Sequence, residues 1–307
     1  FPGTIATRFD QILAELEATI PTIGIALSAV AISCGGMFAT QLAELCGWEG
    51  AMLLGAEGKT SSSSSDPTSL LVMSLLRFTG SPETDNSSTS SLSSVPPLQY
   101  VGFVHMQARD AVRRRWLNTA EKVRAANANC TAFFQAAYRD QVCAATAAAG
   151  AAMVASEVRE KRPHIASSRS GTAASSNLNP GSGGNAAVSW ALWNQVLTRL
   201  PAHAIDTGDA VITKEILCSV EFCGFKCHAG LVGELCHDLS RASEGFQGCE
   251  EGNEFHEWQE GIPRSAHVLN AHPGVFLQQA LNERDSSALC RAAKRFLLEE
   301  EEEGRMT

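Results

Sequence analysis

The stretch Cys218–Cys249, CSVEFCGFKCHAGLVGELCHDLSRASEGFQGC, holds five of the ten cysteines in this 307-residue chain. Two histidines, His228 and His237, each follow a cysteine directly. The bonds that these cysteines form decide how the C-terminal half of the chain is held together. Disulfides, a structural zinc site and free buried thiols are the three interpretations of the stretch.

Disulfides are the first interpretation. If residues 212–228 are helical, Cys223 and Cys227 lie on one face and Cys218 points away from them. Side chains four residues apart keep their Cβ atoms about 5–6 Å apart, whereas a disulfide needs about 3.5–4.5 Å. We therefore expect these cysteines to bond to other elements and to join helix to helix. The disulfide candidates are Cys34, Cys46, Cys130, Cys143, Cys218, Cys223, Cys227, Cys236, Cys249 and Cys290.

Zinc is the second interpretation, because thiolates and imidazoles that lie close together suit a tetrahedral cation. The alternative metal ligands are Cys218, Cys223, Cys227, Cys236 and His237. Their spacing lacks the Cys-x2-Cys and His-x3-5-His pairs that are typical of zinc sites. In the third interpretation the thiols are free and buried, and act as small apolar side chains. We predict disulfides, with no metal and no cofactor.

The composition indicates a folded protein with a substantial core, since 44% of the residues are hydrophobic and 19% are charged. A formal net charge of −9 and a sequence pI near 5.4 argue against nucleic acid as a partner. Two glycosylation sequons begin at Asn86 and Asn129. Together with the ten cysteines they favour an oxidising compartment. We therefore predict a protein of the secretory pathway, extracellular or associated with a membrane.

Residues 18–43 carry no charge, and the segment is long enough to span a bilayer, which takes about 20 residues. A proline, several glycines and many small residues interrupt the apolar run, as they do in buried core helices. We expect a core helix here, with membrane contact through this segment as the alternative. If Gly35 and Gly36 turn the chain, a second helix follows and Cys34 would pair with Cys46 across the turn.

Hydrophobic periodicity predicts helices along most of the chain. Phe9, Ile12, Leu13, Leu16 and Ile20 recur at helical spacing. Residues 98–162 contain no proline, which predicts two long helices that bend near residues 127–130. The apolar run at residues 69–78 predicts a short core helix or a buried strand, and residues 186–200 predict a helix that Pro201 ends.

Three segments rich in serine, glycine or proline divide the chain. Residues 60–66 and 81–97 are expected to be flexible insertions in a helical region that covers residues 1–162. Residues 163–185 are expected to be a linker to a cysteine-rich helical region at residues 186–307. The predicted fold class is mainly α: an irregular helical bundle with Ser/Gly-rich loops and a disulfide-stabilised C-terminal half.

No motif assigns a reaction to this chain. The nucleophile elbow Gly-x-Ser-x-Gly, the zinc pair His-Glu-x-x-His and the dinucleotide turn Gly-x-Gly-x-x-Gly are all absent from the sequence. Because a function must be argued from a site, we predict a non-enzymatic, secreted or membrane-associated helical interaction or scaffold protein with a protein partner. The alternatives are an integral membrane subunit that uses residues 18–43 and a zinc-stabilised intracellular domain.

Overall fold

The computed structural model describes residues 5–33, 36–47, 72, 75–79, 99–160 and 184–305. The elements before residue 161 are α1 (Ile5–Thr19), α2 (Ile23–Ile32), β1 (Met37–Phe38), α3 (Ala39–Cys46), β2 (Leu76–Thr79), β3 (Tyr100–Phe103), α5 (Met106–Trp116) and α6 (Ala120–Glu160). Those that follow are α7 (Gly184–Thr207), α8 (Ala210–Leu217), α9 (Val220–His228), α10 (Val232–Gly245), α11 (Glu250–Ala271), η1 (Pro273–Val275), α12 (Phe276–Leu281) and α13 (Ala288–Arg305).

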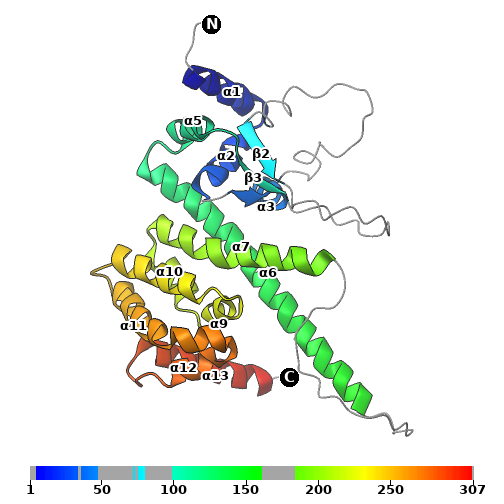
Figure 1. The fold of residues 1–307 in the computed structure, drawn as a ribbon, viewed down its shortest axis with the longest axis vertical. Coiled ribbons are helices and arrows are strands. Elements are labelled where there is room, and N and C mark those ends of the chain that lie inside the picture. The colour runs from blue at the N-terminus through cyan, green and yellow to red at the C-terminus, as the bar shows by residue number, and fades with distance from the viewer. Residues whose placement is uncertain are drawn as a thin grey trace.

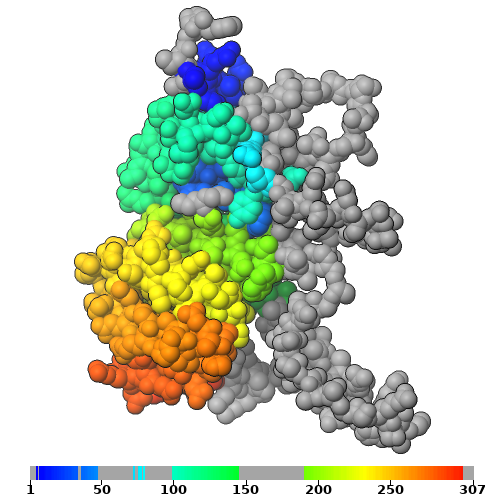
Figure 2. Space-filling model, viewed as in Figure 1, coloured from blue at the N-terminus to red at the C-terminus, as the bar shows by residue number. Residues whose placement is uncertain are grey.

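The described residues form a mainly helical protein, as the sequence predicts. Helices α1, α2, α3 and α5 lie at one end with the small sheet, and α9 to α13 lie at the other (Figure 1). Helices α6 and α7 pack against each other between these two groups. One hydrophobic core runs through all of them, and α10 and α11 pack side by side beneath α7 in the space-filling view (Figure 2).

The uncharged segment 18–43 is divided among the end of α1, all of α2 and β1, and part of α3. Helix α2 is the expected core helix: Ile23, Leu27 and five further side chains of its ten residues are buried. Its small residues let α5 and α6 approach closely, and a Cβ added to Gly24 would lie 3.0 Å from the Trp116 indole nitrogen. Among the described helices, none combines the length and the apolar character that crossing a membrane requires.

The sequence pattern does not predict the sheet as a whole. Strand β3 lies between β1 and β2 and pairs antiparallel with both, with Val101 opposite Met37 and Phe78. The run at residues 69–78 therefore ends as a strand, one of its two predicted forms. Gly36 precedes β1 with a φ of +89°, and a Cβ there would overlap the Val101 carbonyl.

The predicted bend at residues 127–130 is wrong. The break falls earlier, between the end of α5 at Trp116 and the start of α6 at Ala120, and α6 then runs unbroken to Glu160. Thr119 begins the helix, because its side-chain oxygen accepts a bond of 3.3 Å from the Lys122 backbone nitrogen. Asn127 does not break it, because its amide donates to the Val123 carbonyl of the same helix at 3.1 Å.

Helix α7 also differs from its prediction, since it continues through Pro201 to Thr207. It then packs along α6 and α10, so tertiary contacts support the helical turn that the proline weakens.

Between α8 and α9 the chain is not helical at Cys218–Ser219, and the Ser219 hydroxyl accepts from the Phe222 backbone nitrogen at 3.3 Å. The insertions 60–66 and 81–97 and most of the linker 163–185 lie outside the described residues.

Candidate binding pocket and buried polar groups

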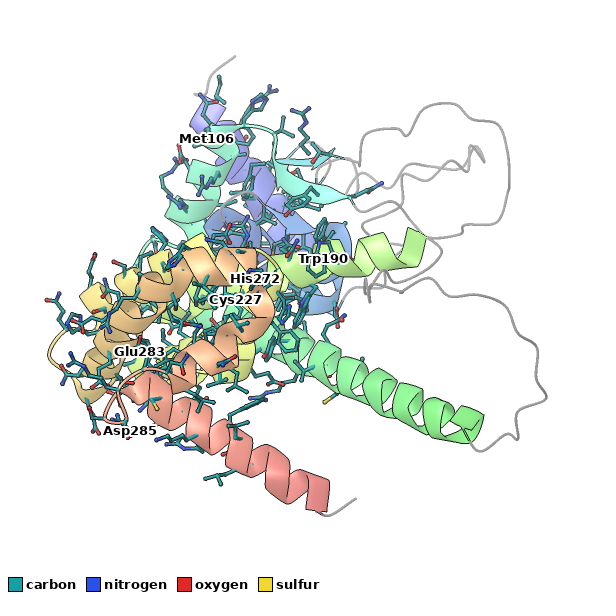
Figure 3. All side chains as sticks on the ribbon, turned by 60° about the horizontal axis from the view of Figure 1, so that its bottom comes forward. Met106, Trp190, Cys227, His272, Glu283 and Asp285 are labelled. Atoms are coloured by element: carbon teal, nitrogen blue, oxygen red, sulfur yellow. The ribbon has the colours of Figure 1, made fainter. Side chains whose placement is uncertain are left out.

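The nine described cysteines are all free thiols. The structure therefore gives no support to the predicted disulfides, and Cys34 lies outside the described residues, as does its predicted bond to Cys46. Cys130 and Cys143 lie thirteen residues apart on the same continuous helix and do not pair. Cys223 and Cys227 share the buried face of α9, and Cys227 lies among the C-terminal helices (Figure 3).

Packing explains these thiols. Burial raises the pKa of Cys227, like that of Cys46, to about 12, and it also raises the pKa of Cys223 well above the usual value for a thiol. Cys223 donates its thiol hydrogen to the Leu217 carbonyl at 3.2 Å, and Cys249 caps α11 by accepting from the Gly252 nitrogen at 3.4 Å. The third interpretation, free buried thiols that act as small apolar side chains, thus describes the five buried cysteines, Cys46, Cys130, Cys223, Cys227 and Cys290.

The alternative zinc site is not assembled. The part of the chain that the structure describes contains no group of three or more His, Cys, Asp or Glu side chains placed to hold a metal ion. This part includes the alternative ligands Cys218, Cys223, Cys227, Cys236 and His237.

A buried ion pair lies beside two of these cysteines. Lys226 is fully buried on α9, and its Nζ lies 2.6 Å from Oδ2 of Asp238 on α10. The ammonium also lies 6.0 Å from the centre of the Phe222 ring. Both charges are thus taken out of water, with each other as the main compensation. The pair fixes how α9 and α10 pack.

Buried polar groups also line the contact between α6 and α7. His203 Nδ1 lies 2.8 Å from Asn127 Oδ1, and the His203 ring stacks on Phe134. Since the Asn127 amide nitrogen donates to Val123, its oxygen accepts here and the histidine donates from Nδ1. Burial, and secondly the charge of Arg199, lower the pKa of His203 to about 4. The imidazole is therefore neutral and acts in packing.

Exposed hydrophobic side chains are scattered over the molecule. They come from α1, α2, α5, α7, α8, α13 and the bend between β3 and α5, and two of them, Met106 and Trp190, lie well apart in Figure 3. Single exposed hydrophobic residues are normal on soluble proteins. Ile25 differs from them, because it is 43% exposed at the edge of a cavity.

This cavity, which we call the α2–α6 pocket, has a volume of about 390 Å³ and lies between α2, the ends of α1 and α3, the end of α5 and the first turns of α6. Its walls are mostly apolar, with Trp116 at one side and Cys130 on α6. The lining residues are Glu17, Pro21, Gly24, Ile25, Ser28, Ala29, Leu45, Trp116, Leu117, Lys122, Ala125, Ala126, Asn129 and Cys130. Volume and lining are in the range of pockets that bind small molecules or single large side chains.

The two charged residues of the α2–α6 pocket differ in their partners. Glu17 accepts from Arg115 at 2.5 Å and from the Trp116 indole nitrogen at 3.2 Å. The first of these bonds is the main reason why the pKa of Glu17 lies below its usual value. Lys122 donates only to the neutral Asn118 oxygen, at 3.0 Å, and has no acidic partner among the described residues. The pocket therefore carries one uncompensated positive charge.

Asn129, a predicted glycosylation site, lies at the same pocket. It is exposed on α6, while Thr131 of its sequon is buried in the same helix. Its side chain has no hydrogen-bond partner within the described parts of the chain. Asn86, the other predicted glycosylation site, lies outside those parts.

Sequence reasoning does not find the α2–α6 pocket, because its walls come from segments about 100 residues apart. The only local signal is the row of Lys122, Ala126 and Asn129 on one face of α6, which carries polar groups at its ends and a small residue between them.

Comparisons of the chain with protein-family models, with characterised proteins and with solved structures found no match.

Proposed function

We propose that the protein is a non-enzymatic helical interaction or scaffold protein, secreted or associated with a membrane, that binds a protein partner at the α2–α6 pocket. The single observation that supports this is the pocket itself. Its cavity of about 390 Å³ has mostly apolar walls and a partly exposed Ile25 at its edge. Concave apolar sites of this size accept the large side chains that dominate binding energy at protein interfaces.

The pocket is also built rigidly. The indole of Trp116 packs on the Gly24 backbone and donates to Glu17, so its ring is fixed before a partner arrives. Glu17 in turn is fixed by Arg115. A preorganised site loses less conformational entropy on binding, which favours affinity.

The chemistry of the lining favours binding over catalysis. Burial, and secondly the nearby Cys46, raise the pKa of the Cys130 thiol to about 12, so that it is protonated near neutral pH and a weak nucleophile. The pKa of Glu17 is lowered by its bonds to Arg115 and Trp116, so the carboxylate is ionised, cannot donate a proton and is a weaker base than an ordinary glutamate. Neither group is prepared for acid–base or nucleophilic work.

A photo-crosslinking experiment tests the proposal. Benzoylphenylalanine replaces Ile25 at the pocket edge or, as a control, Val211, which is exposed on α8. On irradiation in an extract of the source cells or their medium, we expect one discrete protein adduct from position 25 and none from position 211. Equal, diffuse labelling from both positions would contradict the proposal.

Two substitutions on α6 make this experiment specific to the pocket. Ala126→Phe fills the pocket, and Ala128→Phe adds the same ring on an exposed part of the helix that does not line it. The adduct from position 25 should be lost with the first substitution and kept with the second. Thermal unfolding followed by circular dichroism shows whether both variants are folded.

A further inference from the structure

Resting on the function proposed above, we propose that the α2–α6 pocket recognises an acidic and apolar peptide segment of its partner. An apolar side chain of the segment occupies the cavity, and a neighbouring Asp or Glu pairs with Lys122. The charge balance of the lining is the first support. Glu17 is neutralised by Arg115, whereas Lys122 keeps its positive charge, so the pocket is complementary to an anion.

The spacing of the polar groups is the second support. Lys122 and Asn129 are seven residues apart on one face of α6, which separates their backbones by about 10 Å at 1.5 Å per residue. Between them, Ala125 and Ala126 leave room for the cavity. A polar anchor thus lies at either end of an apolar space.

This layout suits a peptide better than a fatty acid. A peptide carries polar groups at regular intervals, so its carboxylate can pair with Lys122 while a main-chain amide bonds to the side chain of Asn129. A fatty acid has one polar head, so it could pair with Lys122 but would offer no hydrogen-bond partner to Asn129. Ile25 and Trp116 then cover the apolar side chain of the peptide from the other side of the pocket.

A random dodecapeptide library displayed on phage tests this chemistry directly. On the wild-type protein we expect enrichment of Asp or Glu within two positions of Leu, Ile, Phe or Trp. On Lys122→Glu the same apolar residues should be enriched beside Lys or Arg. Because Lys122 is exposed and bonds only to Asn118, this variant should fold normally.

Affinities of one enriched peptide give the magnitudes. Lys122→Ala should weaken its binding about two- to fivefold, and Lys122→Glu, which replaces attraction by repulsion, about tenfold. Higher salt should reduce the difference between these variants and the wild type. Ala126→Phe should abolish binding, while Ala128→Phe should bind as the wild type does.

The outcomes separate this inference from the function on which it rests. If Ala126→Phe removes binding but Lys122→Glu leaves the charge preference unchanged, the pocket is a binding site and the acidic segment is refuted. If no peptide is enriched, or if Ala126→Phe changes nothing, both proposals fail. Decanoate and decyltrimethylammonium, which carry the same apolar chain with opposite charges, test a lipid as the ligand. If decanoate alone displaces the peptides from the pocket, and no peptide binds more tightly than decanoate, the ligand is a lipid and the inference is overturned.

Discussion

Replacing Lys226 by methionine removes one partner of the most deeply buried ion pair in the described structure. The side chain of Lys226 is 0% exposed and that of Asp238 is 9% exposed, with 2.6 Å between the charged atoms. At this distance the attraction is about 6 kcal/mol for an effective dielectric constant of about 20, and several kcal/mol per ion of lost hydration oppose it. Removing the lysine alone leaves the carboxylate buried without its partner, so we expect the free energy of unfolding to fall by about 3–5 kcal/mol.

Urea denaturation at pH 7, followed by circular dichroism, measures this loss. Lys294→Met is the matched control, because its pair with Asp285 has a similar length of 2.7 Å but is exposed on both sides, and its denaturation midpoint should not change. The double variant Lys226→Met, Asp238→Leu should recover most of the lost stability, since apolar side chains suit a dry site. A single variant as stable as the wild type, or a double variant no better than the single one, would refute this account of the pair.

Three further predictions concern other parts of the fold. The pKa of His203 is about 4 in the folded protein, whereas the ordinary value for an exposed histidine is 6.5. Between these two pH values only the unfolded chain binds a proton at this histidine. The free energy of unfolding should therefore fall by roughly 3 kcal/mol as the pH drops from 6.5 to 4. Denaturation at both pH values should show a smaller fall for His203→Gln. Gly36→Ala should lower the free energy of unfolding measured with urea by about 1–3 kcal/mol, because the backbone has a positive φ there and a Cβ would overlap the Val101 carbonyl. Gly47→Ala should lower it less, because Gly47 also has a positive φ but no atom lies near the position of its Cβ. The denatured, unreduced protein should react with at least nine equivalents of a thiol reagent, one for each cysteine that is free in the described structure.

Local patterns predicted the helices well where a single face is buried. In α1, Leu13 and Leu16 are fully buried as their spacing predicts, and α2 is a core helix because its small uncharged residues pack closely against α5 and α6, while Ile25 stays exposed at the α2–α6 pocket. The predicted bend at residues 127–130 failed because asparagine is neutral in a helix when its amide bonds within the helix and its oxygen meets His203. Neither partner can be read from the sequence around it.

Long-range contacts explain what the sequence patterns missed. Strands β1, β2 and β3 are two to four residues long and pair between segments that lie far apart in the chain, so no local periodicity marks them as a sheet. The α2–α6 pocket has the same origin, because α2 and α6 supply its walls from separate regions. The charge of Lys122 becomes significant only beside Glu17, whose own charge is already paired with Arg115.

The cysteines show how composition and structure lead to different expectations about compartment. Ten cysteines favoured the secretory pathway on the premise that they form disulfides. Buried thiols such as Cys130 and Cys223 instead fill core space, and their raised pKa values keep them in the protonated form that oxidises slowly. Such residues can be numerous in any compartment, so their number alone carries no information about it. The prediction of secretion therefore rests on the sequons at Asn86 and Asn129, and few free thiols in protein purified without reductant would contradict the packing role described for these cysteines.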